Sequence, residues 1–505
     1  MKVDLFDLMD ELESFRLDAS QALAQETRGK LGQFMTPVPT AELMAAMFKD
    51  LSGDISILDA GAGVGSLTAA VLKEGVVRGG LGEINATLFE IDRTLEPYLQ
   101  SSTATMKEYA LRCGRKFNAK VNFLDFIECY SNASDSERAT FSFDKIILNP
   151  PYLKIGAKSE HRLMLRRAGI EAGNLYSAFV SIGIKCLKPG GELVAITPRS
   201  FCNGPYFNDF RKLILETCSI DKIHVFESRT KSFKGDSVLQ ENIIFRLTKG
   251  EQTKIVDISA STSASDSDFR ARRVPFSAVV DERSSQKFIH IVTSDEEEEI
   301  ANAANSMPCE LSDLNLSVST GRIVDFRNRE ALRTECADGC IPFIYPSHIV
   351  NGVINWPSSK GKGINGFKES LASESMLLPM GSYVVTKRLS SKEEKRRIIA
   401  GVITPDHFNG FPSLGLDNKT NFFHCSGGPV PIEIAYGLSI YLNSTIVDRF
   451  FRQFNGHTQV NATDLRSLKY PTRDQLVELG KNYSVIVSTQ RLIDDRVAEK
   501  LFQQM

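Results

Sequence analysis

The sequence alternates short apolar runs with helical stretches from residue 54 to residue 249, and this alternation constrains the fold more than any other feature. The apolar runs predict strands over residues 54–61, 85–92, 120–126, 143–150, 191–198, 221–228 and 240–249. Apolar strands that alternate with helices form a parallel sheet covered on both faces. We therefore predict an α/β fold with a doubly wound, mostly parallel, seven-stranded sheet.

The chain divides near Gly250, where the alternation ends. We predict a first domain over residues 1–250, in which a helix within residues 3–25 precedes the sheet. A second, mixed α/β domain follows over residues 251–505. The Ser/Asp-rich segment 259–268 predicts a flexible, solvated loop at the start of that second domain.

Composition excludes several classes of protein. No apolar run approaches the ~20 residues that a membrane span needs, and the acidic N-terminus lacks the features of a secretory signal. The nine cysteines are scattered without a CxxC pair, so we expect reduced thiols in a cytoplasmic protein and no metal site. The net charge of −2 argues against a protein that coats nucleic acid by bulk charge, but it allows a local basic face.

A glycine-rich loop, residues 59–65, follows the first predicted strand and opens a helix. Glycines at such a place let the backbone approach a ligand closely at a helix N-terminus. Glu90, at the end of the second strand, is placed to accept both hydroxyls of a ribose. Dinucleotide sites and S-adenosylmethionine sites both use this arrangement, and a tight turn without a ligand would also explain the loop.

The third predicted strand ends at Asp125-Phe126. The carboxylate there could accept the amino group of an adenine, with the aromatic ring alongside. A helix N-cap is the structural alternative for Asp125.

The fourth predicted strand ends at Asn149-Pro150-Pro151-Tyr152, where two successive prolines stop the strand and hold an extended turn. The exocyclic amine of adenine is a poor nucleophile because its lone pair is delocalised into the ring. The Asn149 side-chain oxygen and the Pro150 carbonyl could grip its hydrogens and free that lone pair, while the Tyr152 ring stacks on the base. Such catalysis rests on positioning and preorganised hydrogen bonds.

These motifs resemble, in type and order, those of the γ-class DNA amino-methyltransferases, the TaqI- and PstI-like adenine-N6 enzymes of restriction–modification systems. The family's cofactor-methionine motif precedes the glycine loop, as residues 32–37 do here, and residues 345–357, 387–397 and 442–471 look like segments of the PstI-like branch. The resemblance implies a class I S-adenosylmethionine-dependent methyltransferase fold. It also implies site-specific methylation of a flipped-out adenine in double-stranded DNA, and a C-terminal target-recognition domain.

The resemblance also assigns site residues by position. Its cofactor-binding set is Thr36, Pro37, Asp59, Gly61, Gly63, Glu90, Ile91, Asp125 and Phe126. Thr36 and Asp59 would contact the methionine part of the cofactor, Glu90 its ribose, and Asp125 its adenine amino group. Ile91 and Phe126 would flank the adenine ring. Phe233 is the best match for the aromatic that packs on the flipped base, with Phe207 and Phe226 as alternatives.

Two polar segments of the second domain are candidates for DNA contact. The first carries Lys387, Arg388, Arg396 and Arg397, and the second carries His457, Gln459 and Asn461. A solvated face would explain the first segment equally well, and a structural helix cap would explain the second. The family resemblance favours DNA without assigning particular base contacts.

The catalytic motif leaves other substrates open. Asn-Pro-Pro-Tyr also serves enzymes that methylate a protein glutamine or an amine on an RNA base, and a DNA-binding subunit without catalysis is a further alternative. The early Thr-Pro motif and the long C-terminal half favour DNA. We also expect a monomer without a nuclease of its own; if a cognate restriction endonuclease exists, we expect it to be encoded separately.

Overall fold

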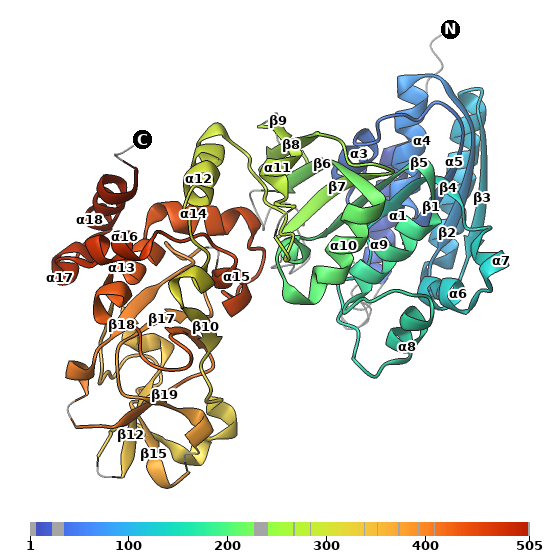
Figure 1. Cartoon of the computed structure of the whole chain (residues 1–505). Coiled ribbons are helices and arrows are strands. Elements are labelled where there is room, and N and C mark those ends of the chain that lie inside the picture. The colour runs from blue at the N-terminus through green and yellow to red at the C-terminus, as the bar shows by residue number, and fades with distance from the viewer. Residues whose placement is uncertain are drawn as a thin grey trace. The chain divides into compact units, whose positions relative to one another are not determined.

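The computed structural model describes residues 7–22, 35–226 and 241–502, apart from residues 266–267, 283, 338, 351, 372–373, 392 and 409. The chain forms two compact units, unit 1 over Met1–Thr293 and unit 2 over Ser294–Met505 (Figure 1). Each unit is built around its own sheets.

A nine-stranded sheet forms the centre of unit 1, in the order β3-β2-β1-β4-β5-β7-β6-β8-β9. Its strands are β1 Gly53–Ala60, β2 Leu81–Phe89, β3 Lys116–Asn122, β4 Phe143–Leu148, β5 Leu187–Pro198, β6 Cys218–Phe226, β7 Asn242–Lys249, β8 Ile255–Ser261 and β9 Arg270–Pro275. The strands from β3 to β5 run parallel, and β7 lies antiparallel between β5 and β6. The predicted α/β class and all seven predicted strands are confirmed.

Strands β8 and β9 extend the sheet beyond the expected domain boundary at residue 250. The supposed loop 259–268 begins as a strand, because Ser259–Ser261 belongs to β8 and pairs in parallel with β6. The reason is local chemistry around the buried His224 of β6: Ser259 Oγ and Ser261 Oγ lie 2.9 and 3.1 Å from its two ring nitrogens. The serine-rich sequence predicts a loop because His224, whose ring nitrogens the serines contact, is far away in sequence.

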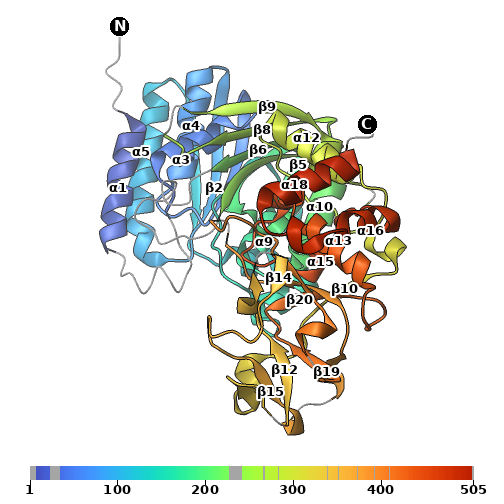
Figure 2. The same ribbon diagram turned by 90° about the vertical axis from the view of Figure 1, so that its left-hand side faces the viewer.

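Helices cover both faces of this sheet, and each face has its own apolar core (Figure 2). The first face is covered by α1 Leu8–Ala22, α3 Val38–Ala46, α4 Ser66–Arg78 and α5 Glu96–Arg112. The second is covered by α6 Phe126–Asn132, α8 Glu160–Arg167, α9 Leu175–Cys186, α10 Asn208–Thr217 and α11 Phe276–Val279, while the short α7 Asp135–Arg138 buries no residue. A helix was predicted within residues 3–25, and α1 confirms it.

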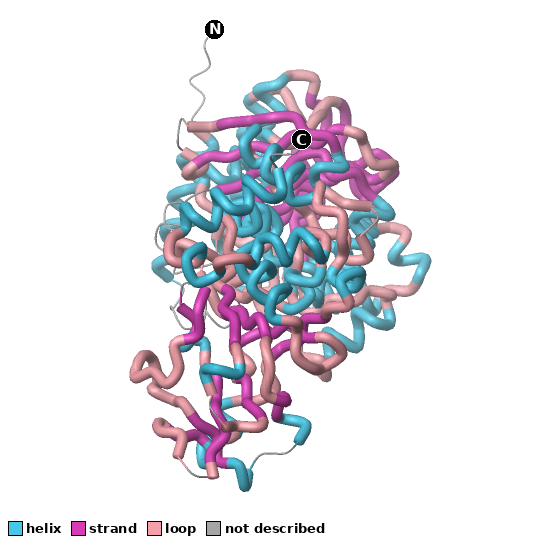
Figure 3. Tube along the Cα trace, turned by 60° about the vertical axis from the view of Figure 1, so that its left-hand side comes forward, coloured by secondary structure: helices cyan, strands magenta, loops and turns pink. Residues whose placement is uncertain are grey.

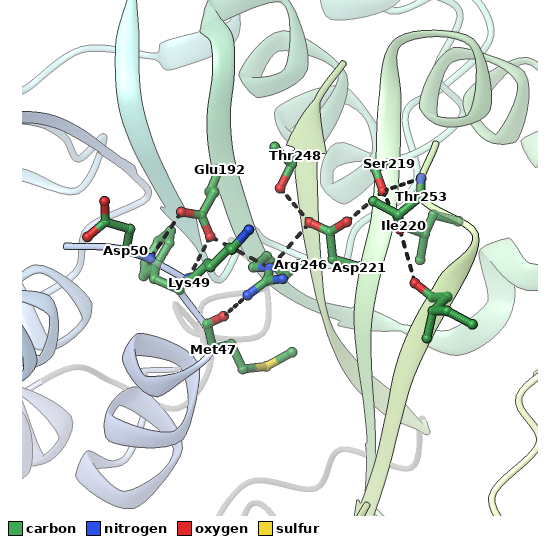
Figure 4. A network of polar contacts seen from close by, with 12 residues as sticks. Met47, Lys49, Asp50, Glu192, Ser219, Ile220, Asp221, Arg246, Thr248 and Thr253 are labelled. Carbon is green, nitrogen blue, oxygen red and sulfur yellow. Dashed lines mark hydrogen bonds and ion pairs between the residues drawn. The ribbon is translucent and has the colours of Figure 1, made fainter. Parts of the chain in front are cut away.

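A buried charge network crosses the middle of the sheet on the α3 side (Figure 4). Glu192 of β5 accepts the backbone N–H of Lys49 at 2.7 Å and the ammonium of Lys145 from β4. The Arg246 Nε of β7 lies 3.6 Å from Glu192 Oε2 and 3.4 Å from Asp221 Oδ2 of β6. None of these four charged side chains is more than 10% exposed, so the ions compensate one another.

Unit 2 combines two sheets with a group of helices. The six-stranded sheet has the order β10-β20-β17-β18-β14-β13, and the five-stranded sheet has the order β11-β15-β12-β19-β16. Their strands are β10 Ser317–Thr320, β11 Leu332–Arg333, β12 Cys340–Ile344, β13 Ile349–Val350, β14 Gly352–Ile354, β15 Gly366–Lys368, β16 Leu377–Pro379, β17 Tyr383–Lys387, β18 Ala400–Ile403, β19 Ser413–Leu416 and β20 Thr420–His424.

The helices of unit 2 are α12 Asp295–Asn305, α13 Ile432–Leu442, α14 Thr445–Phe454, α15 Ala462–Arg466, α16 Arg473–Gly480, α17 Tyr483–Ile486 and α18 Gln490–Val497. Within this unit, α13 to α18 gather at one end, and the five-stranded sheet lies at the other (Figures 1 and 3). The predicted mixture of strands and helices in the second half is present.

Candidate cofactor and catalytic site

A cavity of about 370 Å³ opens at the carboxyl ends of β1, β2 and β4. Parallel sheets bind their ligands at this edge. The predicted site residues that line it are Thr36, Gly61, Gly63, Glu90, Ile91, Asp125, Phe126, Asn149 and Pro151. The structure therefore brings together residues that are spread over more than a hundred positions of sequence. Pro37, Asp59, Pro150 and Tyr152 are not among the lining residues.

Sequence reasoning missed the segment that follows Tyr152. Its lining residues are Leu153, Lys154, Ile155, Gly156, Ser159 and His161. The segment is held in place where the N–H of Ile155 donates to the Gly173 carbonyl at 2.9 Å. Its position directly after the catalytic motif was the available signal.

The glycine loop has the open backbone that the sequence suggested. Gly61 and Gly63 have φ values of 76° and 57°, in the left-handed region that favours glycine. Among the described residues, no atom lies within 4 Å of the place where a Cβ of Gly63 would stand, so this part of the loop has room for a ligand. Helix α4 begins just beyond the loop, at Ser66, which places the loop at a helix N-terminus.

Glu90 connects the loop to the neighbouring strand. Its two carboxylate oxygens accept the N–H groups of Gly63 and Asp92, each at 2.8 Å. Burial raises the pKa of Glu90 above its ordinary value. The carboxylate has further lone pairs, so the structural bonds leave it able to accept ribose hydroxyls.

Asp125 caps a helix and also lies at the cavity, and its contact with the adenine of a cofactor stays a prediction. One carboxylate oxygen accepts the N–H of Glu128 at 3.0 Å and caps α6, while the residue also lines the cavity. The other oxygen lies 2.8 Å from His161 Nε2 on α8. His161 therefore orients the carboxylate that was expected to bind the cofactor's adenine.

Asp59 lies fully buried behind the glycine loop. Its Oδ2 accepts the hydroxyl of Thr68 at 2.8 Å, while Oδ1 has no hydrogen-bond partner in the described part of the chain. Burial raises the pKa of Asp59 to about 7. The expected contact with the cofactor stays a prediction, since the side chain does not line the cavity.

The raised pKa of Asp59 predicts how stability depends on pH. The unfolded carboxyl releases its proton near pH 3.8, whereas the folded one keeps it to about pH 7, so this group's contribution to stability falls as pH rises through that window. Asp59→Asn should remove this fall. Urea unfolding of both proteins between about pH 5 and 7.5 measures the difference.

Asp144→Asn provides the control, because it should leave the pH slope of stability between about pH 5 and 7.5 unchanged. Partial burial raises the pKa of Asp144, but hydrogen bonds from Lys188 and Ser56 lower it below the ordinary value. Its stabilising contribution is present above the unfolded pKa and is lost as pH falls. Equal pH slopes in wild type and Asp59→Asn would contradict the buried-acid assignment.

The Asn149 side chain is held at both ends. Its Nδ2 donates to Thr36 Oγ1 at 2.9 Å, and its Oδ1 accepts the Tyr152 hydroxyl at 3.2 Å. Tyr152 packs edge-on against Tyr176, with ring centroids 6.3 Å apart, and burial raises the pKa of its hydroxyl. The amide oxygen is thus oriented before any substrate arrives.

The expected base-stacking ring, Phe233, lies outside the described residues. Of the two alternatives, Phe207 is buried and stacks on Tyr176 at 5.5 Å. Phe226 is buried at the end of β6. Neither alternative presents a free ring, so the assignment to Phe233 stays a prediction.

The two segments expected to contact DNA lie side by side in unit 2. The N–H of Val460 donates to the Arg388 carbonyl at 2.8 Å, and the N–H of Ser390 donates to the Thr458 carbonyl at 3.0 Å. Gln459 is exposed, and Lys387 is partly exposed at the end of β17. The contact of Lys387, Arg388, His457, Gln459 and Asn461 with DNA stays a prediction; Asn461 also precedes α15 as its N-cap.

Arg397 has a structural role, which corrects its assignment as a phosphate contact, while the contact of the partly exposed Arg396 with DNA stays a prediction. Arg397 is only 2% exposed, and its guanidinium donates to Ser390 Oγ at 3.1 Å and to Asn455 Oδ1 at 2.7 Å. Arg396 donates to the Asn443 carbonyl. The basic run looks solvated in sequence, but it leads into the buried strand β18, and its last arginine, Arg397, turns inward.

The described residues show neither a metal-binding cluster nor a membrane-spanning helix. Within residues 7–22, 35–226 and 241–502, apart from their short gaps, no cluster of three or more His, Cys, Asp or Glu side chains is placed to hold a metal ion. No helix in those same ranges combines the length and apolar content of a membrane span. All nine cysteines are free thiols.

Comparison with known proteins identifies the family. Residues 85–233 match the family described as Eco57I restriction-modification methylase. The type II methyltransferase M.PstI of Providencia stuartii is 48% identical over 97% of this chain and 96% of its own length. M.BsuBI of Bacillus subtilis, also a type II methyltransferase, is 45% identical over 94% of each chain.

Two solved structures share the fold. The type IIL restriction-modification enzyme MmeI, in complex with DNA, has a TM-score of 0.55 at 13% identity, covering 98% of this chain and 75% of that one. The type ISP restriction-modification enzyme LlaBIII has a TM-score of 0.51 at 11% identity, covering 93% of this chain and 40% of that one. These structures show the fold alone, whereas the identity to M.PstI and M.BsuBI, which extends over nearly the full length, shows that the chain belongs to their family of type II methyltransferases.

Proposed function

We propose that the protein transfers a methyl group from S-adenosylmethionine to the N6 amine of an adenine within a specific sequence of double-stranded DNA. The observation that carries the proposal is Asn149-Pro150-Pro151-Tyr152 at the end of β4, with the Asn149 amide held at the cavity by Thr36 and Tyr152. Membership of the type II methyltransferase family supports it.

The residues around the cavity fit S-adenosylmethionine. Glu90 supplies a carboxylate for the ribose hydroxyls, and Asp125 supplies one for the adenine amino group. Ile91 is 52% exposed and, like Phe126, lines the cavity, so the two offer apolar contact to a flat ring. The open backbone at Gly63 gives a bound molecule close access to the chain. When bound, this cofactor supplies an electrophilic methyl group.

The protein's own contribution to the reaction is to prepare the amine. The Asn149 oxygen and the Pro150 carbonyl accept the two hydrogens of the adenine amine and draw its nitrogen toward tetrahedral geometry. Because Thr36 and Tyr152 already orient Asn149, little reorganisation is needed when the base arrives. The Tyr152 ring, and Phe233 by family resemblance, would hold the base in line with the methyl group.

The target base must leave the duplex to reach this site, at a cost of a few kcal/mol. We propose that unit 2 recognises the surrounding sequence and supplies binding energy, with Lys387, Arg388, His457, Gln459 and Asn461 among its contacts. We place the recognition domain in unit 2, Ser294–Met505, and not in residues 251–505 as first expected. The reason is that β8 and β9, which follow residue 250, belong to the nine-stranded sheet of unit 1. The protein would act as a monomer beside a separately encoded endonuclease.

Methyl transfer to defined substrates tests the function. The purified full chain with methyl-labelled S-adenosylmethionine should label double-stranded DNA, and nucleoside analysis should find the label in N6-methyladenine at one sequence. Structured RNA and a protein extract are the parallel substrates, because the same catalytic motif serves RNA and glutamine amines. Label in either of these but not in DNA, or label in N4-methylcytosine, would contradict the proposal.

A further inference from the structure

A buried carboxylate joins three surface loops of unit 2. Asp325, only 3% exposed, accepts the hydroxyl of Tyr345 at 2.8 Å and the ammonium groups of Lys362 and Lys419 at 2.8 and 2.6 Å. Burial raises the pKa of Asp325, but these three donors outweigh it and hold the pKa well below its ordinary value. We call residues 325–330, 358–365 and 417–419 the three-loop cluster.

The side chain of Asn365 holds the middle loop of the cluster, residues 358–365, through hydrogen bonds. The Asn365 Oδ1 accepts the N–H of Ser358 at 2.7 Å and lies 3.0 Å from His348 Nε2, while its Nδ2 donates to the Ser358 carbonyl at 3.1 Å. Gly361 and Gly363, at φ values of 66° and 61°, turn the loop outward. A loop held by so many buried polar contacts is preorganised.

The outer surface of the cluster is basic and carries an exposed ring. Phe326 is 60% exposed, and the Arg327 guanidinium lies 5.6 Å from its ring centroid. Arg329 and Lys360 are exposed as well. Of the acids in the cluster, Asp325 and Asp417 are buried, which leaves Glu330 as the exposed one among residues 325–330, 358–365 and 417–419.

The cluster is continuous with the strip already expected to face DNA. The N–H of Arg388 donates to the Lys419 carbonyl at 2.9 Å, and its guanidinium donates to the Asn418 carbonyl at 3.1 Å. A chain of contacts therefore links Gln459, through Leu389 and Arg388, to Lys419, Asp325 and Lys362. Exposed cations and an aromatic ring on rigid loops match a polyanion that also presents flat apolar faces.

We propose that the three-loop cluster is a DNA-contacting surface of this protein, in which Arg329 and Lys360 bind phosphates and Phe326 makes an uncharged contact with sugar or base. The proposal rests on the proposed function, because it takes the methylated duplex as the partner. It assigns the phosphate contacts to loops that lie outside the basic run around Arg397.

The test compares two double variants of the full chain, each of which removes two positive charges from unit 2. The test variant is Arg329→Ala/Lys360→Ala, and the matched control is Lys481→Ala/Arg491→Ala, whose side chains are 58% and 89% exposed. Binding is measured on the duplex that wild type methylates, between about 50 and 200 mM salt. The logarithm of the binding constant falls linearly with the logarithm of the salt concentration, and the loss of two phosphate contacts makes this slope less steep by about 1.8. The ratio of the wild-type to the test-variant binding constant should therefore be about tenfold smaller at 200 mM than at 50 mM salt.

Phe326→Ala supplies an independent arm, because it should weaken binding without changing the salt slope. Unchanged emission from Trp356, whose Nε1 donates to the Asn365 carbonyl at 2.8 Å, checks that the middle loop is intact in each variant. If wild type methylates DNA and the test variant binds like the control, the surface assignment is wrong while the proposed function stands. If wild type transfers no methyl group to DNA, the proposed function itself fails.

Discussion

Asn149→Ala should lower the turnover number by about two to three orders of magnitude, a loss of roughly 2.7–4 kcal/mol of transition-state stabilisation. The reason is that the side-chain oxygen acts on the amine only as its nitrogen becomes nucleophilic. Affinity for S-adenosylmethionine and for DNA should change little, because Glu90, Asp125 and the glycine loop remain in place. Single-turnover methyl transfer, with equilibrium dialysis of labelled cofactor, separates the two effects.

Two conservative variants control for the side chain's neighbours. Tyr152→Phe removes the hydroxyl that donates to Asn149 but keeps the ring, and Thr36→Ser keeps the acceptor for the amide nitrogen. Both should reduce turnover by less than about tenfold, since each leaves the catalytic oxygen in place. A loss of under about tenfold in Asn149→Ala would show that another group prepares the amine.

Glu192→Ala should lower the free energy of unfolding by about 3–5 kcal/mol, because it leaves the buried charges of Lys145 and Arg246 without their shared carboxylate. Glu192→Gln should lose less, since its amide oxygen still accepts the N–H of Lys49. Urea unfolding followed by far-UV circular dichroism measures the change. The single tryptophan, Trp356, reports on unit 2 in the same samples.

The matched control for this prediction is an exposed ion pair. Arg491 and Asp495 are 89% and 65% exposed, so Arg491→Ala should change stability by about 1 kcal/mol or less. A Glu192→Ala loss as small as that of the control would mean that water, and not the protein, compensates the charges of the network.

The sequence alone determined the parallel part of the sheet in unit 1 and the residues at the ends of its strands that line the cavity. Short apolar runs predict the buried strands, and residues such as Gly61, Glu90 and Asn149 lie at the carboxyl ends of these strands. Parallel topology then brings those ends to one edge, which is why residues far apart in sequence line a single cavity. Local periodicity and turn chemistry were sufficient for this part of the prediction.

Only the tertiary structure decided which polar residues face inward and what they satisfy. The serines of β8 lie in the sheet, where they contact the ring nitrogens of the buried His224. Arg397 is buried, and Asn455 and Ser390 accept hydrogen bonds from its guanidinium. The pairing of His161 with Asp125 likewise joins two elements separated in sequence. A charged or polar side chain has the same local pattern whether it meets water or a distant partner, so its burial is settled by long-range packing alone.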